Sequence, residues 1–409
     1  MAVARRRMID LHAHYPMHVV PDGDKLSLFR LLWARGGLSR LRAIVRALLV
    51  NLASLFLNYR TVLSGPRVRM KYLREGEVSV ALSVLYSFFD ELDVLDGARP
   101  KPPYLARLEG QLKDVTDYVT ERHPDDAVIA RNPRDLKQAR DDEKIALIHC
   151  VEGGFHLGAD PGSVDAAVRK LAGLGVVYIT LAHLIWREVG TNAPALPFLS
   201  EEGYRRWFPQ PDEGLSELGE AAVRAMVRER VLIDVSHMSE LALDDTFALL
   251  KDLDPPGDAP IPVIASHAGY RLGEQEYMLP PKRLKQIAAR GGVVGLIFAE
   301  HQLADGLPAR QRAALRLPGE TSRRRFKRSF RVLCRHIDGI RDATGSHAFT
   351  AIGSDLDGFI KPTLPGLDDM RDMKRLKAAL LKRYGEDDAE RISSGNALRL
   401  LESYWRGAP

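Results

Sequence analysis

The amino-acid sequence predicts an α/β protein, a (β/α)8 TIM-type barrel with a helical insertion after the first strand. Eight short, apolar, β-branched runs recur along the 409 residues, and segments with helical periodicity lie between them. Most of these runs end on a histidine or a carboxylate. Alternating strands and helices favour a parallel sheet, and a closed barrel gathers the carboxyl ends of its strands at one mouth. An open doubly wound sheet could also use eight strands, but the chain length and the polar strand ends favour the barrel.

The elements follow one another in a regular order. We expect strands at "MIDLHAH" from residue 8, "EVSVALSVLY" from 77, "KIALIHCVEG" from 144, "GVVYITLAH" from 175, "VLIDVSH" from 231, "IPVIASH" from 261, "GGVVGLIF" from 291 and "AFTAIGSD" from 348. Amphipathic periodicity predicts helices over 104–122, 163–173, 215–230, 240–252, 281–290 and 323–344, and two more after the last strand. Residues 1–409 are therefore expected to form one domain.

Two segments depart from the strand and helix alternation. Residues 24–66 form a long insertion with apolar positions at helical spacing, and its apolar stretches, interrupted by Arg46, are shorter than the ~18 residues that a membrane span needs. We interpret this insertion as a helical lid or a surface for homo-oligomer formation, with peripheral membrane contact as the less favoured alternative. Residues 187–214, rich in Pro, Gly and aromatic residues, are expected to be a loop at the barrel mouth that shapes a substrate pocket.

Composition narrows the functional class. The net charge is +5, but the excess lies in short basic runs such as "RRRFKR" at 323–328, without interleaved aromatic residues, so nucleic acid is not an expected partner. Two cysteines, Cys150 and Cys334, are too few for a disulfide framework, and no apolar segment of signal-peptide length precedes His12. We therefore expect a cytoplasmic enzyme.

The polar strand ends predict a metal centre. Side chains at i and i+2 share a face of a strand, so His12 and His14 can point into the barrel together. Imidazole nitrogens combined with a single carboxylate suit zinc. Five ligands exceed the need of one catalytic ion, whereas two Zn²⁺ ions about 3.5 to 4 Å apart, with a bridging water or hydroxide, would use them all. The predicted ligands are His12, His14, Glu152, His237 and His267, with Glu152 as the bridge.

Two further strand ends carry candidate catalytic groups. Asp355, in "GSDLDG", is either a terminal metal ligand or a proton shuttle, whereas Asp357 is expected to be structural. His183 ends "YITLAH" and would hydrogen-bond a carbonyl oxygen as negative charge develops there.

The sequence resembles the membrane or renal dipeptidase family, zinc peptidases of the amidohydrolase-like barrel class. The resemblance rests on "DLHAH", "LREGEVSVALSVLY", "VEGG", "YITLAH", "RVLIDVSHMS", "PVIASHAGYR", "GGVVGLIF", "HIDGIRDATG", "GSDLDGF" and "SGNALRLLE", and it covers nearly the whole chain except 24–66. It implies hydrolysis of dipeptides, with tolerance of a C-terminal D-residue. It also implies that Glu152 bridges the ions, His183 contacts the scissile carbonyl, and Asp355 exchanges protons with the water and the leaving amine.

Two departures from the family pattern leave alternatives open. The first strand has His-x-His where the family has His-x-Asp. The family also places an arginine in the loop after the sixth of the expected strands to clamp the substrate carboxylate, and Tyr277 stands at the matching position, with Arg271 nearby. An amidohydrolase for a lactam, cyclic amide, ester or N-acyl amino acid is therefore the first alternative. The second is a non-catalytic barrel that binds a membrane or a protein partner through its insertion.

Overall fold

Eight parallel strands close into a barrel in the computed structural model, which describes residues 7–15, 66–91, 97–197, 199–317, 321–358 and 362–408. The strands are hydrogen-bonded in the order β1-β2-β4-β5-β6-β7-β8-β9. Closure between β1 and β9 comes from His14, which donates its backbone N–H to the Leu356 carbonyl at 3.0 Å, and from Asp355, which donates to the His12 carbonyl at 2.9 Å. The predicted fold class is confirmed.

The strands that form the barrel coincide with the eight apolar runs of the sequence. Their bounds are β1 (Met8–Ala13), β2 (Val78–Leu85), β4 (Ile145–Glu152), β5 (Tyr178–Thr180), β6 (Leu232–Asp234), β7 (Val263–Ala268), β8 (Val293–Leu296) and β9 (Thr350–Ile352). A further short strand, β3 (Ala127–Ile129), pairs with β4 outside this order.

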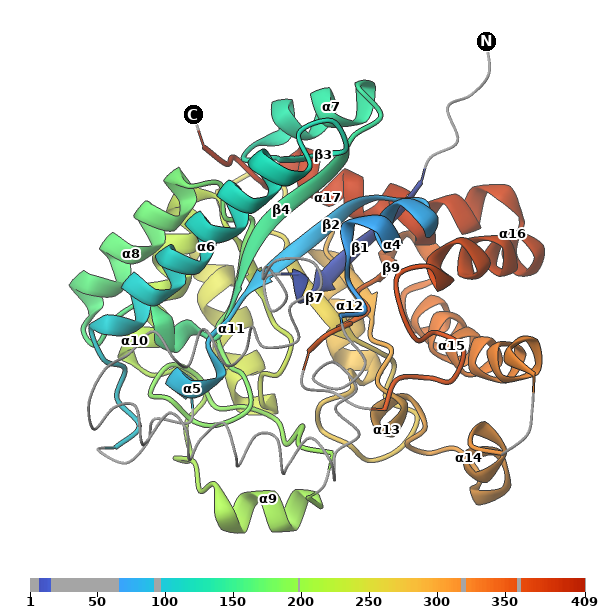
Figure 1. Ribbon diagram of the computed structural model, residues 1–409. Coiled ribbons are helices and arrows are strands. Elements are labelled where there is room, and N and C mark those ends of the chain that lie inside the picture. The colour runs from blue at the N-terminus through green and yellow to red at the C-terminus, as the bar shows by residue number, and fades with distance from the viewer. Residues whose placement is uncertain are drawn as a thin grey trace, which may run out of the picture.

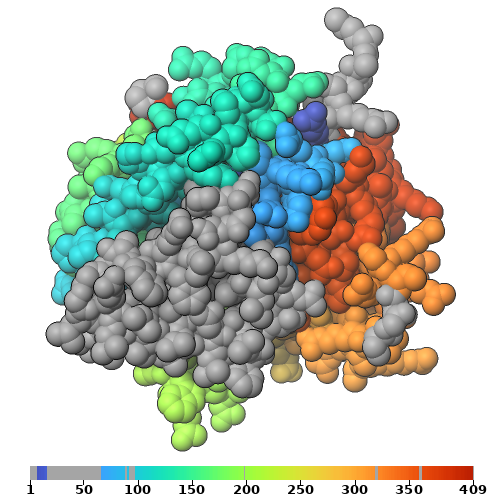
Figure 2. Space-filling model, in the orientation of Figure 1, coloured from blue at the N-terminus to red at the C-terminus, as the bar shows by residue number. Residues whose placement is uncertain are grey.

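Helices surround the strands (Figure 1), and the space-filling view in the same orientation shows the teal surface of α6 at the upper left and the orange to red surface of α15 and α16 at the right (Figure 2). The α-helices are α4 (Met70–Glu75), α5 (Phe88–Glu91), α6 (Pro103–Arg122), α7 (Pro133–Asp141), α8 (Pro161–Gly173), α9 (Glu201–Trp207), α10 (Glu217–Glu229), α11 (Glu240–Leu253), α12 (Pro281–Ala289), α13 (Glu300–Leu303), α14 (Ala309–Leu315), α15 (Ser322–Thr344), α16 (Asp372–Glu390) and α17 (Asn396–Tyr404). Short 3₁₀ turns, η2 (Gly154–His156) and η3 (His347–Phe349), and the π-helical η4 (Arg391–Gly395) complete the described elements.

The six helices predicted by their ranges are present, and the differences from the sequence prediction are confined to short elements. The three residues of β3 are too few to show a strand period, and α7 follows at once, begun by an Asn132 side chain that accepts from the Asp135 N–H. The expected mouth loop at 187–214 contains α9, which begins where the Ser200 hydroxyl accepts from the Gly203 N–H. Among the described residues no helix has the length and apolar character that a membrane span requires.

The predicted insertion at 24–66 lies outside the described residues apart from its last position. Directly after the insertion, the backbone N–H groups of Arg67 and Val68 both donate to Asp357 Oδ2 at 2.8 Å. Asp357 thus fastens the return of the chain to the loop after β9, in agreement with the structural role expected for it. Whether residues 1–409 form one domain stays a prediction.

Two glycines allow β7, β8 and β9 to approach one another closely. A Cβ at Gly295 would lie 2.0 Å from the Ser266 carbonyl oxygen, and a Cβ at Gly353 would lie 1.8 Å from the same atom. Real Cβ atoms do not approach backbone oxygens so closely, so a side chain at either position would push the strands apart. This close approach matters for function because Ser266 lies beside His267 at the mouth.

We expect Gly295→Ala to destabilise the protein by about 3 kcal/mol or more, because the new methyl group overlaps backbone that cannot move freely. Chemical denaturation followed by circular dichroism measures the change. Gly110→Ala is the matched control: no heavy atom lies within 4 Å of its Cβ position on α6, so helix propensity predicts a gain of up to about 1 kcal/mol. Equal effects of the two substitutions would contradict the packing argument.

Candidate metal centre

Imidazole side chains at the ends of β1, β6 and β7 meet around one buried carboxylate, Glu152, at the end of β4. Its Oε1 lies 3.3 Å from His12 Nε2, 3.4 Å from His267 Nε2 and 3.8 Å from His237 Nε2. Its Oε2 lies 3.4 Å from His14 Nε2. All five side chains are at least 97% buried. The structure therefore brings together the whole set of ligands predicted from the sequence, with Glu152 between the two pairs of imidazoles.

Asp355 adds a second carboxylate beside His12 and His14, the two histidines at the end of β1. The Asp355 Oδ1 atom lies 3.1 Å from His14 Nε2 and 3.8 Å from His12 Nε2. Asp355 has a φ of 55° and His237 a φ of 65°, in the left-handed region that residues with a Cβ seldom occupy. Such backbone costs about 1 to 3 kcal/mol and persists where the surroundings enforce it, often at functional sites. Asp and His are among the residue types that tolerate it best.

Hydrogen bonds behind the rings set the tautomers of two imidazoles. His12 Nδ1 lies 2.7 Å from the Tyr178 hydroxyl, which itself donates to the Leu11 carbonyl, so the ring nitrogen is the donor. His267 Nδ1 lies 2.8 Å from the Ser266 hydroxyl. With a proton on Nδ1, Nε2 is the atom of each ring that faces Glu152 and is available to bind an ion. This is the arrangement that metal-ligating histidines use.

The protonation states of Glu152, His237 and His267 favour the binding of cations. Burial opposes ionisation of Glu152, but His183 and His12 lower its pKa well below the ordinary value, so it is an anion. Burial and the neighbouring imidazoles hold the pKa values of His237 and His267 well below normal, so these rings are neutral. Their Nε2 atoms are nevertheless only 2.9 Å apart. Two neutral imidazoles held this close together beside a buried carboxylate fit a bound metal ion.

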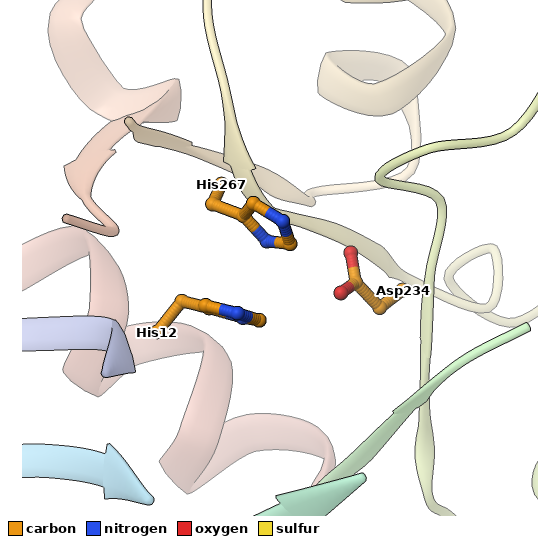
Figure 3. A group of neighbouring side chains, drawn as sticks. All are labelled: His12, Asp234 and His267. Atoms are coloured by element: carbon orange, nitrogen blue, oxygen red, sulfur yellow. The ribbon is translucent and has the colours of Figure 1, made fainter. Parts of the chain in front are cut away.

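Three sets of ligand atoms are close enough to hold an ion, each within 4.8 Å. These are His12, His14 and Asp355; Glu152, His237 and His267; and His12, Asp234 and His267. Figure 3 shows the third set, in which the two rings and the carboxylate face a common point. The first set contains the two histidines at the end of β1, the second contains Glu152 with His237 and His267, and the two sets correspond to the two predicted ion positions.

His183 lies beside the centre and is held by a glutamate that sequence analysis missed. Its Nε2 is 3.3 Å from Glu152 Oε1, and its Nδ1 is 2.6 Å from Glu91 Oε2. Glu91 Oε1 accepts the backbone N–H groups of Leu184 and Ile185 at 2.7 and 3.0 Å. Burial disfavours charge on His183, but Glu152 and Glu91 raise its pKa to about 10. Glu91 belongs to the four-residue helix α5 and shows no periodic signal in the sequence.

The two predicted substrate-binding residues are engaged in other contacts. Tyr277 is buried, packs edge-on against His237 at 4.9 Å between ring centroids, and donates its hydroxyl to the His267 carbonyl at 2.7 Å. The Arg271 guanidinium donates to Glu240 Oε1 at 2.8 Å and to the carbonyls of Glu276 and Met278 at 2.7 and 2.6 Å. Tyr277 therefore lines the centre, whereas the recorded contacts of Arg271 hold the loop after β7.

Comparison of the amino-acid sequence with those of known proteins assigns the chain to a family. The sequence profile described as "Membrane dipeptidase (Peptidase family M19)" matches residues 48–405. The chain belongs to the membrane dipeptidase family. The protein named dipeptidase verJ of Clonostachys rogersoniana is 28% identical over 302 residues, which cover 73% of this chain and 65% of that protein. The match thus spans just under two thirds of the relative's length.

Two solved structures share the fold of this chain. A metallopeptidase from Rhodobacter sphaeroides, liganded with a phosphinate mimic of the dipeptide L-Ala-D-Ala, matches with a TM-score of 0.64 at 20% identity over 98% of this chain and 99% of that one. The probable dipeptidase PvdM from Pseudomonas aeruginosa matches with a TM-score of 0.61 at 21% identity over 82% of this chain and 88% of that one. Membership in this metallopeptidase family implies a metal cofactor, and the buried ligand sets fit one.

We expect Glu91→Gln to lower the pKa of His183, because one of the two carboxylates that stabilise the imidazolium is lost. The folded-state pKa of about 10 lies above the unfolded value of about 6.5, so the charged ring stabilises the metal-free protein below about pH 6.5. This contribution is lost as the pH rises through the folded-state pKa. NMR titration of His183 in chelator-treated protein measures the shift. Glu300→Gln, which removes a buried glutamate paired with Arg316, serves as the control. A pKa that stays near 10 in Glu91→Gln would be incompatible with this role.

Proposed function

We propose that the chain is a zinc-dependent dipeptidase that binds two Zn²⁺ ions and hydrolyses the amide bond of small dipeptides. The observation that carries the proposal is the position of Glu152, an ionised carboxylate between two pairs of imidazoles. His12 and His14 would hold one ion, His237 and His267 the other, and Glu152 would contact both. Nitrogen donors with one shared carboxylate suit zinc better than the oxygen-seeking Mg²⁺ or Ca²⁺.

Residues of the chain supply the remaining functions. Bound in this centre, the ions would make water acidic enough to attack near neutral pH and would polarise the scissile carbonyl. His183, cationic and held by Glu91, would donate from Nε2 to the carbonyl oxygen as negative charge develops on it. Asp355 Oδ1 would accept the proton of the attacking water and return it to the leaving nitrogen. The left-handed backbone at Asp355 aims this carboxylate at the centre.

The relatives support a dipeptide as substrate. The Rhodobacter sphaeroides metallopeptidase was crystallised with a mimic of L-Ala-D-Ala, and this supports the proposal that the present chain also accepts a C-terminal D-residue. A cytoplasmic location is likewise a proposal, with which the two free, buried thiols of Cys150 and Cys334 agree. Homo-oligomer formation and membrane contact through residues 24–66 stay predictions.

A second candidate function has a specific observation in its favour. Recognition of a free substrate carboxylate calls for a cation at the mouth. Arg271 donates instead to Glu240 and to backbone carbonyls, and the Tyr277 hydroxyl is bound to the His267 carbonyl. An amidohydrolase that acts on a lactam, cyclic amide or ester with the same metals would need no such cation, whereas an N-acyl amino acid carries the same free carboxylate as a dipeptide. The non-catalytic barrel has less support, because it gives no reason to bury this many ligands in one place.

We expect the purified chain to release free amino acids from L,L- and L,D-dipeptides, to lose this activity on chelation, and to regain it with about two equivalents of Zn²⁺. Glu152→Gln keeps the size of the side chain but removes the negative charge, so turnover should fall by about 10³-fold or more while the circular dichroism spectrum stays unchanged. Ninhydrin assay and metal analysis measure both. A variant with near-normal turnover would exclude the bridging role.

We expect only a small preference for a free dipeptide over its C-terminal amide, less than about tenfold in kcat/KM, because Arg271 is engaged elsewhere. Steady-state kinetics on matched pairs of substrates measure the ratio, and Arg271→Gln should leave it unchanged. A preference of about 100-fold or more that disappears in Arg271→Gln would show that this arginine does recognise the carboxylate. Hydrolysis of lactams or N-acyl amino acids, but of no dipeptide, would favour the second candidate.

A further inference from the structure

One hydroxyl group behind the metal centre contacts an imidazole from each of the two predicted ion sites. We propose that Ser266 is a positioning residue shared by both sites, whose hydroxyl holds His12 and His267 in the tautomer that leaves Nε2 free to bind metal. This inference rests on the two-ion centre of the proposed function. It concerns a residue that belongs to none of the ligand sets.

The three shortest contacts of the Ser266 hydroxyl determine where its proton points, and a fourth, to Ser236 Oγ, is longer at 3.5 Å. Ser266 Oγ lies 2.6 Å from Asp234 Oδ2, 2.8 Å from His267 Nδ1 and 3.1 Å from His12 Nδ1. A carboxylate oxygen can only accept, so the single hydroxyl proton points to Asp234. The two lone pairs of the oxygen then accept N–H donors from the two rings. Both rings are thereby protonated at Nδ1, which leaves Nε2 as the nitrogen of each ring that can bind metal.

Asp234 fixes the direction of this hydroxyl and is not itself available as a ligand. Its Oδ1 accepts the backbone N–H groups of Ser236 and Ser266 at 3.0 and 2.9 Å and the Ser236 hydroxyl at 2.8 Å. Its Oδ2 accepts the hydroxyls of Thr180 and Ser266, both at 2.6 Å. The cluster in Figure 3 is therefore an anchored support for the two rings, although its atoms lie close enough together to suggest a third metal site.

The two rings depend on Ser266 to different degrees. His12 Nδ1 has a second partner, the Tyr178 hydroxyl at 2.7 Å, which is held in place by the Leu11 carbonyl. Within the described residues, the hydrogen bond of His267 Nδ1 is to Ser266 alone. Loss of the Ser266 hydroxyl should therefore affect the His237–His267 site more than the His12–His14 site. Loss of the Tyr178 hydroxyl should affect only the latter.

Zn²⁺ affinity of the metal-free, full-length protein tests the inference without reference to peptidase activity. Competition with a chromophoric chelator gives two dissociation constants, which His14→Ala and His237→Ala assign to the two sites. Partners of metal-bound histidines are typically worth 10- to 100-fold in affinity, so we expect Ser266→Ala to weaken the His237–His267 site by about that factor and the other site by less. Ser266→Thr, which keeps a hydroxyl, should restore the affinity of both sites.

Ser236→Ala is the matched control. Ser236 is a buried serine whose hydroxyl donates to the same carboxylate, accepts the His267 backbone N–H at 3.2 Å and lies 3.5 Å from Ser266 Oγ, but it is hydrogen-bonded to no imidazole nitrogen of the described residues. We expect it to cost comparable stability and to leave both dissociation constants near those of the wild type. If Ser236→Ala and Ser266→Ala weakened Zn²⁺ binding equally, the effect would be one of general packing and the inference would be overturned. Wild-type Zn²⁺ affinities in Ser266→Ala would overturn it as well.

Tyr178→Phe keeps the inference testable if Ser266→Ala does not fold. Because Ser266 still supports His267 in this variant, only the His12–His14 site should weaken, and equal weakening of both sites would overturn the proposal. The d–d absorption spectrum of the Co²⁺-substituted protein provides a second measurement, since it reports ligand geometry at each site. A wild-type protein that binds fewer than two ions would overturn the proposed function itself, before any variant is compared.

Discussion

A negative charge buried among imidazoles is the constraint around which the rest of this molecule is arranged. Glu152 is almost completely shielded from water, yet its pKa lies well below the ordinary value, and five Nε2 atoms from the ends of four other strands lie within 3.8 Å of its oxygens. Removing such a charge from water is costly unless cations compensate for it. The strands of the barrel orient the imidazoles toward Glu152. The hydroxyls of Tyr178 and Ser266, behind the rings of His12 and His267, fix which ring nitrogen carries the proton.

The strand ends that carry the ligands were predictable because two simple rules apply to them. Side chains alternate along a strand, and parallel strands of a barrel end at one mouth, so His12, His14, Glu152, His237 and His267 could be placed together from their positions in eight apolar runs. His183 and Asp355 followed in the same way. Short elements did not, since β3 has three residues and α5 has four, too few for a period to show.

The supporting layer was beyond prediction for a different reason. Glu91 reaches His183 from 92 positions away, and Ser266 reaches His12 across 254 positions. Each contact depends on the relative placement of elements that share no local pattern. The partial signals were Asp234, a carboxylate inside an apolar strand, and Ser266, a hydroxyl directly before a predicted ligand. Either could be explained equally well by an ordinary hydrogen bond, and only the folded geometry shows what each one contacts.

The left-handed backbone at His237 and Asp355 restricts which residues can replace them during evolution. Branched side chains such as Val, Ile and Thr are strongly disfavoured there whatever their chemistry, because their Cβ substituents clash in that conformation. Asparagine and glycine are the replacements that the main chain tolerates readily. Asparagine at position 355 would keep the shape but could no longer carry a proton. Divergence toward new substrates is therefore easier at the surrounding loops than at these two positions.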